Sequence, residues 1–90
     1  MKPIQKIKIE DIHENFSSHI FVRGEEYFEE GLVDNLEVID QNSISGVVRG
    51  NYDYDVCVTI DEDENLICDC SCPCDFNCKH AVALLLELIK

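Results

Sequence analysis

Hydrophobic and polar positions divide the chain into a helical first third, a strand-rich middle and an apolar last helix. In residues 17–30, apolar side chains recur at a spacing of seven, as Phe21 and Phe28 do, and glutamates fall largely on the other side. Gly31 follows the last periodic residue and suits a left-handed helix cap. The pattern predicts a helix over about residues 17–30 that starts at a serine cap and covers a sheet, with one or two helical turns over 11–16 before it.

The middle of the chain alternates between apolar and polar residues, as strands do. Val56, Val58 and Ile60 would face one side of a strand, and the residues between them the other. Short polar turns separate the apolar stretches, and short turns join antiparallel neighbours because parallel pairs need long crossovers. We therefore expect a four-stranded antiparallel meander with strands at residues 32–40, 44–49, 54–61 and 66–70.

Residues 78–90 predict a helix that is apolar on nearly every face, with Glu87 as its one charged residue between Ala81 and the final Lys90. In a lone domain of 90 residues, part of such a helix would be exposed to water. We therefore expect either that the chain is a piece of a longer protein or that this helix docks onto a partner. The candidate partner-binding residues are Leu85, Leu88 and Ile89.

Together these elements predict one α+β domain: an N-terminal helix, a four-stranded antiparallel β-meander, a metal-binding loop and a C-terminal helix. We divide it into an N-terminal arm at 1–18, whose first ten residues lie near the surface, a helix plus meander at 19–67, and a cysteine-rich segment with its helix at 68–90. A core this small benefits from a staple such as a metal ion.

Charge and cysteine content narrow the partners and the compartment. Acidic residues outnumber basic ones by 19 to 7, for a formal charge of -12, and such a surface repels phosphate. No run of 18 apolar residues is present, so no membrane span is expected. The N-terminus has no apolar leader, so we expect a reducing, cytoplasmic location in which six cysteines bind metal rather than form disulfides.

The candidate chemistry lies in thirteen residues that hold Cys68, Cys70, Cys72, Cys74, Cys78 and His80. A Cys-x-Cys pair at the end of a strand and a Cys-x-His pair at the start of a helix supply the four ligands of a tetrahedral Zn²⁺ site. Four protein ligands leave no open position for water, so one structural zinc ion is expected and no enzymatic activity. The spacing does not suit a Cys-x-x-Cys redox site or an iron–sulfur cluster.

The ligand register has more than one solution. We favour Cys70, Cys72, Cys78 and His80, because Pro73 ends the strand directly after the Cys70–Cys72 pair. The competing set replaces Cys72 with Cys68, and Cys74 could replace one ligand of either set.

The motif resembles the SWIM zinc finger, a family found in Swi/Snf-type ATPases and Mutator-type transposases. The resemblance rests on Cys70-Ser71-Cys72-Pro73, then Cys78-Lys79-His80 and the apolar helix, and it extends upstream to about residue 20. It implies metal-ligand roles for Cys70, Cys72, Cys78 and His80.

The resemblance implies binding of protein or DNA, within an ATPase of that type or a related regulatory protein. The acidic charge favours contact with a protein or with another domain of the same polypeptide. The alternative is a DNA-binding finger that positions the ATPase on DNA, which would require Arg23, Arg49 and Lys79 to form a local basic patch with the N-terminal lysines.

Overall fold

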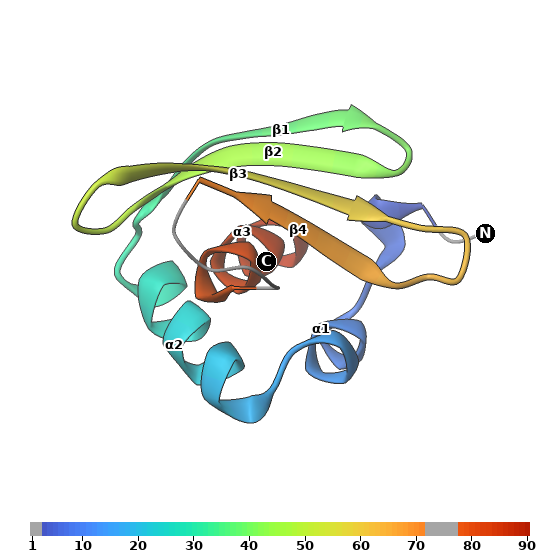
Figure 1. The fold of residues 1–90 in the computed structure, drawn as a ribbon, viewed down its shortest axis with the longest axis horizontal. Helices are drawn as coiled ribbons and strands as arrows, with labels where there is room; N and C mark the ends of the chain where they lie inside the picture. The colour runs from blue at the N-terminus through green and yellow to red at the C-terminus, as the bar shows by residue number, and fades with distance from the viewer. Residues whose placement is uncertain (1–2, 72–77) are drawn as a thin grey trace.

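A computed structural model describes residues 3–71 and 78–90 of the chain. Within these residues the chain forms a short 3-10 helix η1 (Ile4–Lys6), three α-helices and a four-stranded antiparallel sheet. Figure 1 shows the sheet as one layer, with the helices gathered on one of its faces. The predicted α+β class is therefore confirmed.

The helical first third consists of α1 (Ile9–Asn15) and α2 (Ser18–Glu29). The Ser17 hydroxyl accepts a hydrogen bond from the Ile20 backbone N–H at 3.3 Å, so Ser17 is the N-cap of α2. After α2, Gly31 adopts a φ of 72°, the left-handed conformation that the sequence predicted. Local capping signals thus set both ends of this helix.

The middle of the chain forms the predicted meander, with strand order β1-β2-β3-β4 and antiparallel pairing throughout. Alternation places the apolar side chains of the strands on the face that the helices cover, where Ile44, Val56 and Val58 are buried. The strands are β1 (Val33–Asp40), β2 (Ser43–Arg49), β3 (Asp53–Ile60) and β4 (Leu66–Cys70).

The last helix, α3 (Lys79–Ile89), lies between the sheet and the other helices (Figure 1). It contacts α1, α2 and each of the four strands. Every residue from His80 to Leu86 is buried, and the expected exposure is confined to Lys79 and to the C-terminal end, where residues 87–89 are half-buried and Lys90 is exposed. The helix is apolar on all sides because the sheet covers one side of it and α1 and α2 cover another.

This placement changes the set of candidate partner-binding residues. Leu85 is fully buried in the domain's own core, so its side chain is not available to a partner. The prediction that Leu85 binds a partner is therefore wrong. Leu88 and Ile89 pack against the same core but are only partly buried.

Across the described residues, no helix has the length and apolar character needed to cross a bilayer.

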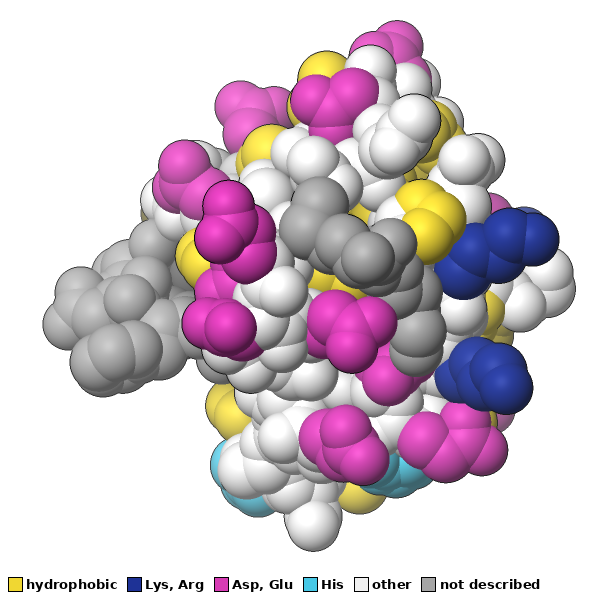
Figure 2. Space-filling view, turned by 90° about the vertical axis from the view of Figure 1, so that its right-hand side faces the viewer, with side chains coloured by type: hydrophobic (Ala, Val, Ile, Leu, Met, Phe, Trp, Pro, Cys, Tyr) yellow, Lys and Arg dark blue, Asp and Glu magenta, His cyan; other side chains and the backbone are white. Residues whose placement is uncertain are grey.

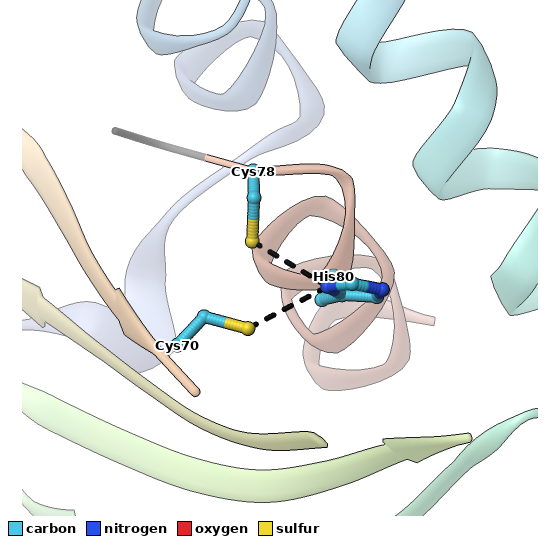
Figure 3. A group of neighbouring side chains, drawn as sticks. All are labelled: Cys70, Cys78 and His80. Atoms are coloured by element: carbon cyan, nitrogen blue, oxygen red, sulfur yellow. Dashed lines mark hydrogen bonds between the residues drawn. The ribbon is translucent and has the colours of Figure 1, made fainter. Parts of the chain in front are cut away.

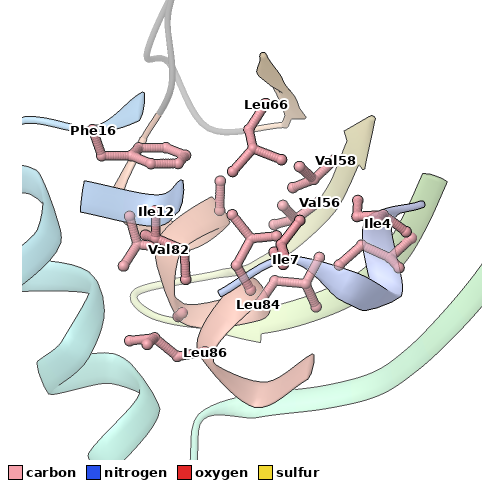
Figure 4. Packing of buried hydrophobic residues seen from close by; sticks show 14 of the residues in the cluster. Ile4, Ile7, Ile12, Phe16, Val56, Val58, Leu66, Val82, Leu84 and Leu86 are labelled. Carbon is pink, nitrogen blue, oxygen red and sulfur yellow. The ribbon is translucent and has the colours of Figure 1, made fainter. Parts of the chain in front are cut away.

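The N-terminal segment belongs to the core at two positions where surface exposure was expected. Ile4 and Ile7 are buried and join Ile12 and Phe16 in the apolar cluster around α3 (Figure 4). The Ile4 backbone N–H donates a hydrogen bond to the Gln41 carbonyl oxygen at 2.8 Å, which ties η1 to the β1–β2 turn. These isoleucines close one end of the core. The segment is too short and too weakly patterned for this burial to be predicted from its sequence.

Gly24, which weakens the helical pattern of α2, lies in close contact with the start of α3. A Cβ built at Gly24 would overlap the Val82 side chain and would lie 2.7 Å from the Lys79 carbonyl oxygen. Gly24 itself is buried. The small residue therefore lets the two helices pack together near the start of α3.

We expect Gly24→Ala to destabilise the domain by about 1–3 kcal/mol, because an extra methyl group in a packed contact forces the helices apart. Thermal melting measures this loss, and Glu29→Ala, at an exposed position of the same helix, is the matched control. Alanine is the better helix former in the absence of a clash. A melting temperature for Gly24→Ala at or above that of the wild type would therefore contradict the close packing.

Candidate metal centre

Strand β4 carries two cysteines on the face that looks toward α3. In the antiparallel register, Cys70 pairs with Val56 and Cys68 pairs with Val58, and both valines are buried. Both cysteines pack against the apolar core. The alternation of the strand thus delivers two thiols to the inner face, two residues apart.

The first turn of α3 supplies the other side of the site. Cys78 is the N-cap residue of the helix and His80 is its second residue, and their exposed fractions are 1% and 3%. The Nδ1 atom of His80 lies 3.5 Å from the Cys70 Sγ and 3.7 Å from the Cys78 Sγ (Figure 3). The three ligand atoms all lie within 4.8 Å of one another.

These separations fit a tetrahedral zinc ion. With Zn–S near 2.3 Å and Zn–N near 2.0–2.1 Å, a tetrahedron places sulfur and nitrogen about 3.5 Å apart and two sulfurs about 3.8 Å apart. The two observed S···N separations are 3.5 and 3.7 Å. Two thiols and an imidazole are also a ligand set that Zn²⁺ prefers. Cys70, Cys78 and His80 can therefore hold a zinc ion.

Local hydrogen bonding favours the thiolate form of Cys78. The Cys68 thiol, whose Sγ lies 3.8 Å from the Cys78 Sγ, donates to Cys78 and lowers its pKa. Hydrogen bonds from His80 and from the Ala81 backbone N–H lower this pKa further, although burial opposes them. The same contact raises the pKa of Cys68, the donor. Since metal ions bind thiolates, Cys78 is prepared for coordination.

The structure brings together three of the four predicted ligands. Cys70, Cys78 and His80 converge from β4 and α3, as the Cys-x-Cys and Cys-x-His spacing predicted. The fourth predicted ligand, Cys72, and the alternative Cys74 lie outside the described residues. The complete set with Cys72 therefore stays a prediction.

Cys68 is the alternative ligand that the structure does describe. Its Sγ lies at a tetrahedral edge length from the Cys78 Sγ, but Cys68 is not part of the three-residue group in which all ligand atoms are mutually close. Cys68 is therefore next to the site and contacts one of its ligands. Cys57 faces the opposite side of the sheet from Val56 and Val58, away from the site.

Two aromatic neighbours of the site were not singled out from the sequence. Tyr27 of α2 and Tyr54 of β3 both contact the His80 ring. Strand alternation places Tyr54 on the same face as Val56, and the helical pattern places Tyr27 on the apolar side of α2. Tyr27 and Tyr54 lie 26 or more positions from His80 in the sequence. Their contacts with His80 depend on the tertiary packing of three elements, which no local sequence pattern predicts.

In a comparison with protein families, residues 56–89 match the SWIM zinc finger. The matched segment begins in β3 and includes β4 and α3, so it contains the whole cluster of Cys70, Cys78 and His80. The resemblance that the motif indicated is confirmed for this segment, and its extension upstream to about residue 20 stays a prediction. Neither the curated proteins nor the solved structures yielded a match.

Zinc content, measured by elemental analysis of purified variants, tests the ligand set. We expect loss of bound zinc in Cys70→Ser, Cys72→Ser, Cys78→Ser and His80→Ala, because three ligands rarely satisfy a structural zinc site. Cys57→Ser is the matched control and should retain one zinc ion, as should Cys68→Ser and Cys74→Ser. Zinc loss in Cys68→Ser together with retention in Cys72→Ser would show that Cys68, and not Cys72, is the fourth ligand.

Proposed function

We propose that the SWIM zinc finger at residues 56–89 makes this domain a structural zinc-binding module whose folded surface contacts a protein or another domain of the same polypeptide. We further propose that the host is a Swi/Snf-type ATPase or a related regulatory protein. The module would act in the cytoplasm, where reducing conditions keep the thiols available for metal.

One observation carries the structural role: the candidate ligands join the end of β4 to the start of α3, the helix at the centre of the core. A metal ion held by Cys70, Cys78 and His80 fixes the first turn of that helix against the sheet. Binding energy at such a site becomes folding energy, since the unfolded chain has no preformed site. The zinc ion therefore supports the whole domain rather than a peripheral loop.

A closed set of protein ligands also argues against an enzymatic role. SWIM zinc fingers are small binding modules rather than catalytic domains. With Cys72 as the fourth ligand, no position would remain for a water molecule or a substrate. We therefore propose that the zinc ion has no catalytic function.

The arrangement of charges supports protein rather than DNA as the partner. Three cations that a DNA-binding patch would need have local partners. Arg49 Nε lies 2.6 Å from an Asp34 carboxylate oxygen, and Arg23 is paired with Glu26. The third, the Lys79 ammonium, lies 5.8 Å from the centre of the Tyr27 ring. Two of the three cations are thus paired with carboxylates of the domain itself, which reduces the positive charge that they offer to phosphate.

The surface gives the same indication. On the face shown in Figure 2, Asp and Glu side chains are spread widely, whereas Lys and Arg lie near one edge. The outer face of the sheet has a hollow of about 540 Å³. Its lining includes Glu37, Asp55 and Asp69 and, among the described residues, no Lys or Arg. Phosphate groups would be repelled there.

Removal of zinc should unfold most of the domain, not only the segment after Cys70. The apo domain would lose the anchor of α3, and zinc binding is worth on the order of 10–16 kcal/mol in zinc-finger peptides, against about 5–15 kcal/mol for the total stability of a domain. We expect a strong chelator to abolish the cooperative thermal transition followed by circular dichroism. Readdition of Zn²⁺ should restore the transition, and identical melts with and without chelator would refute the structural role.

Titration of fluorescent duplex DNA at about 50 mM salt tests the alternative, because phosphate contacts are strongest at low salt. We expect no binding by the zinc-loaded domain at micromolar concentrations. A basic DNA-binding protein in the same assay shows that the duplex is competent. Saturable, salt-sensitive binding would favour the DNA-positioning role instead.

A further inference from the structure

We propose that Tyr27 and Tyr54 are positioning residues that clamp the His80 ring so that Nδ1, rather than Nε2, faces the metal. The inference rests on the proposed zinc module and names two residues outside its ligand motif. Tyr27 comes from α2 and Tyr54 from β3, so the clamp joins two elements to the first turn of α3.

The two tyrosines hold the imidazole in different ways. The Tyr54 ring stacks on the His80 ring, with centroids 4.4 Å apart and an angle of 26° between the planes. The Tyr27 ring meets His80 edge to face, with centroids 5.3 Å apart and an angle of 76°. Stacked and edge-to-face contacts are the two preferred geometries of aromatic pairs. Together they restrict both the tilt and the rotation of the imidazole.

The clamp takes the place of a hydrogen bond that such histidines usually have. A metal-ligating histidine normally donates its second ring N–H to a carboxylate, a carbonyl or water, which fixes the tautomer and the orientation. In the described part of the chain, the Nε2 of His80 is buried and has no hydrogen-bond partner. Its Nδ1 faces the sulfurs of Cys70 and Cys78. Aromatic packing is therefore the contact that orients this ring.

The backbone is shaped to admit both rings. A Cβ built at Gly50, in the β2–β3 turn, would lie 3.2 Å from a Tyr54 ring carbon and 3.4 Å from a Tyr27 ring carbon. Tyr54 lies on β3 two residues before Val56, the register partner of Cys70, so the ring is next to the strand end that carries the thiol. The turn, the strand and α2 thus converge on one imidazole.

Zinc affinity of substituted proteins, measured by competition with a chromophoric chelator, tests the clamp. We expect Tyr54→Leu and Tyr27→Leu each to lower the affinity about 10- to 100-fold, the usual effect of losing a contact that orients a ligand. Tyr54→Phe and Tyr27→Phe should bind as the wild type does, since the ring and not the hydroxyl makes the contact. Val22→Leu, at an exposed position of α2, is the control.

A second measurement separates positioning from general packing. In a His80→Cys background the site has no imidazole to orient, so Tyr54→Leu should leave the zinc affinity unchanged relative to that background. The visible spectrum of bound Co²⁺ should change in Tyr54→Leu and not in Tyr54→Phe. An equal loss of affinity in both backgrounds, or leucine variants that bind zinc as tightly as the wild type, would overturn the clamp.

The failure of this inference is distinct from the failure of the proposed function. A wild-type protein that binds no zinc would overturn the zinc module itself, and the clamp with it. A wild-type protein that binds zinc, with leucine variants that also bind it normally, would overturn only the clamp.

Discussion

The burial of α3 is the interaction on which the rest of the structure depends. Its apolar side chains fill the space between the inner face of the sheet and the pair α1 and α2. Burial of each large aliphatic side chain is worth about 1.5–3 kcal/mol. Cys78 and His80 lie at the start of this helix. A metal ion held there would fix the first turn of the core helix against the sheet.

Local patterns were sufficient for the elements and insufficient for their packing. Alternation in Val56, Val58 and Ile60 and the serine and glycine at the ends of α2 determine structure within a few residues, so the strands and that helix were predictable. The fully apolar sequence of α3 has two interpretations, a central core helix and a partner-binding helix. Only the positions of α1 and α2, which come from elsewhere in the chain, distinguish them.

In the metal centre too, local patterns predict some features and tertiary packing determines the others. Spacing within the chain was enough to find Cys70, Cys78 and His80, because a strand end and a helix start each present ligands two residues apart. The contacts of Tyr27 and Tyr54 with His80 span sequence separations of 53 and 26 residues and follow from tertiary packing alone. The candidate ligands are thus predictable from local spacing, whereas the orientation of the His80 ring depends on the packing of the assembled domain.

The position of α3 in the chain has a consequence for biosynthesis. A ribosome makes the sheet before it makes the helix that covers the sheet, so the nascent meander exposes its apolar face, including Ile44, Val48 and Val58, until Ile89 has left the exit tunnel. Cys68 and Cys70 emerge during the same interval, ahead of Cys78 and His80. A nascent chain in this state is exposed to aggregation, and a chaperone that covers the apolar face would protect it until α3 can pack there.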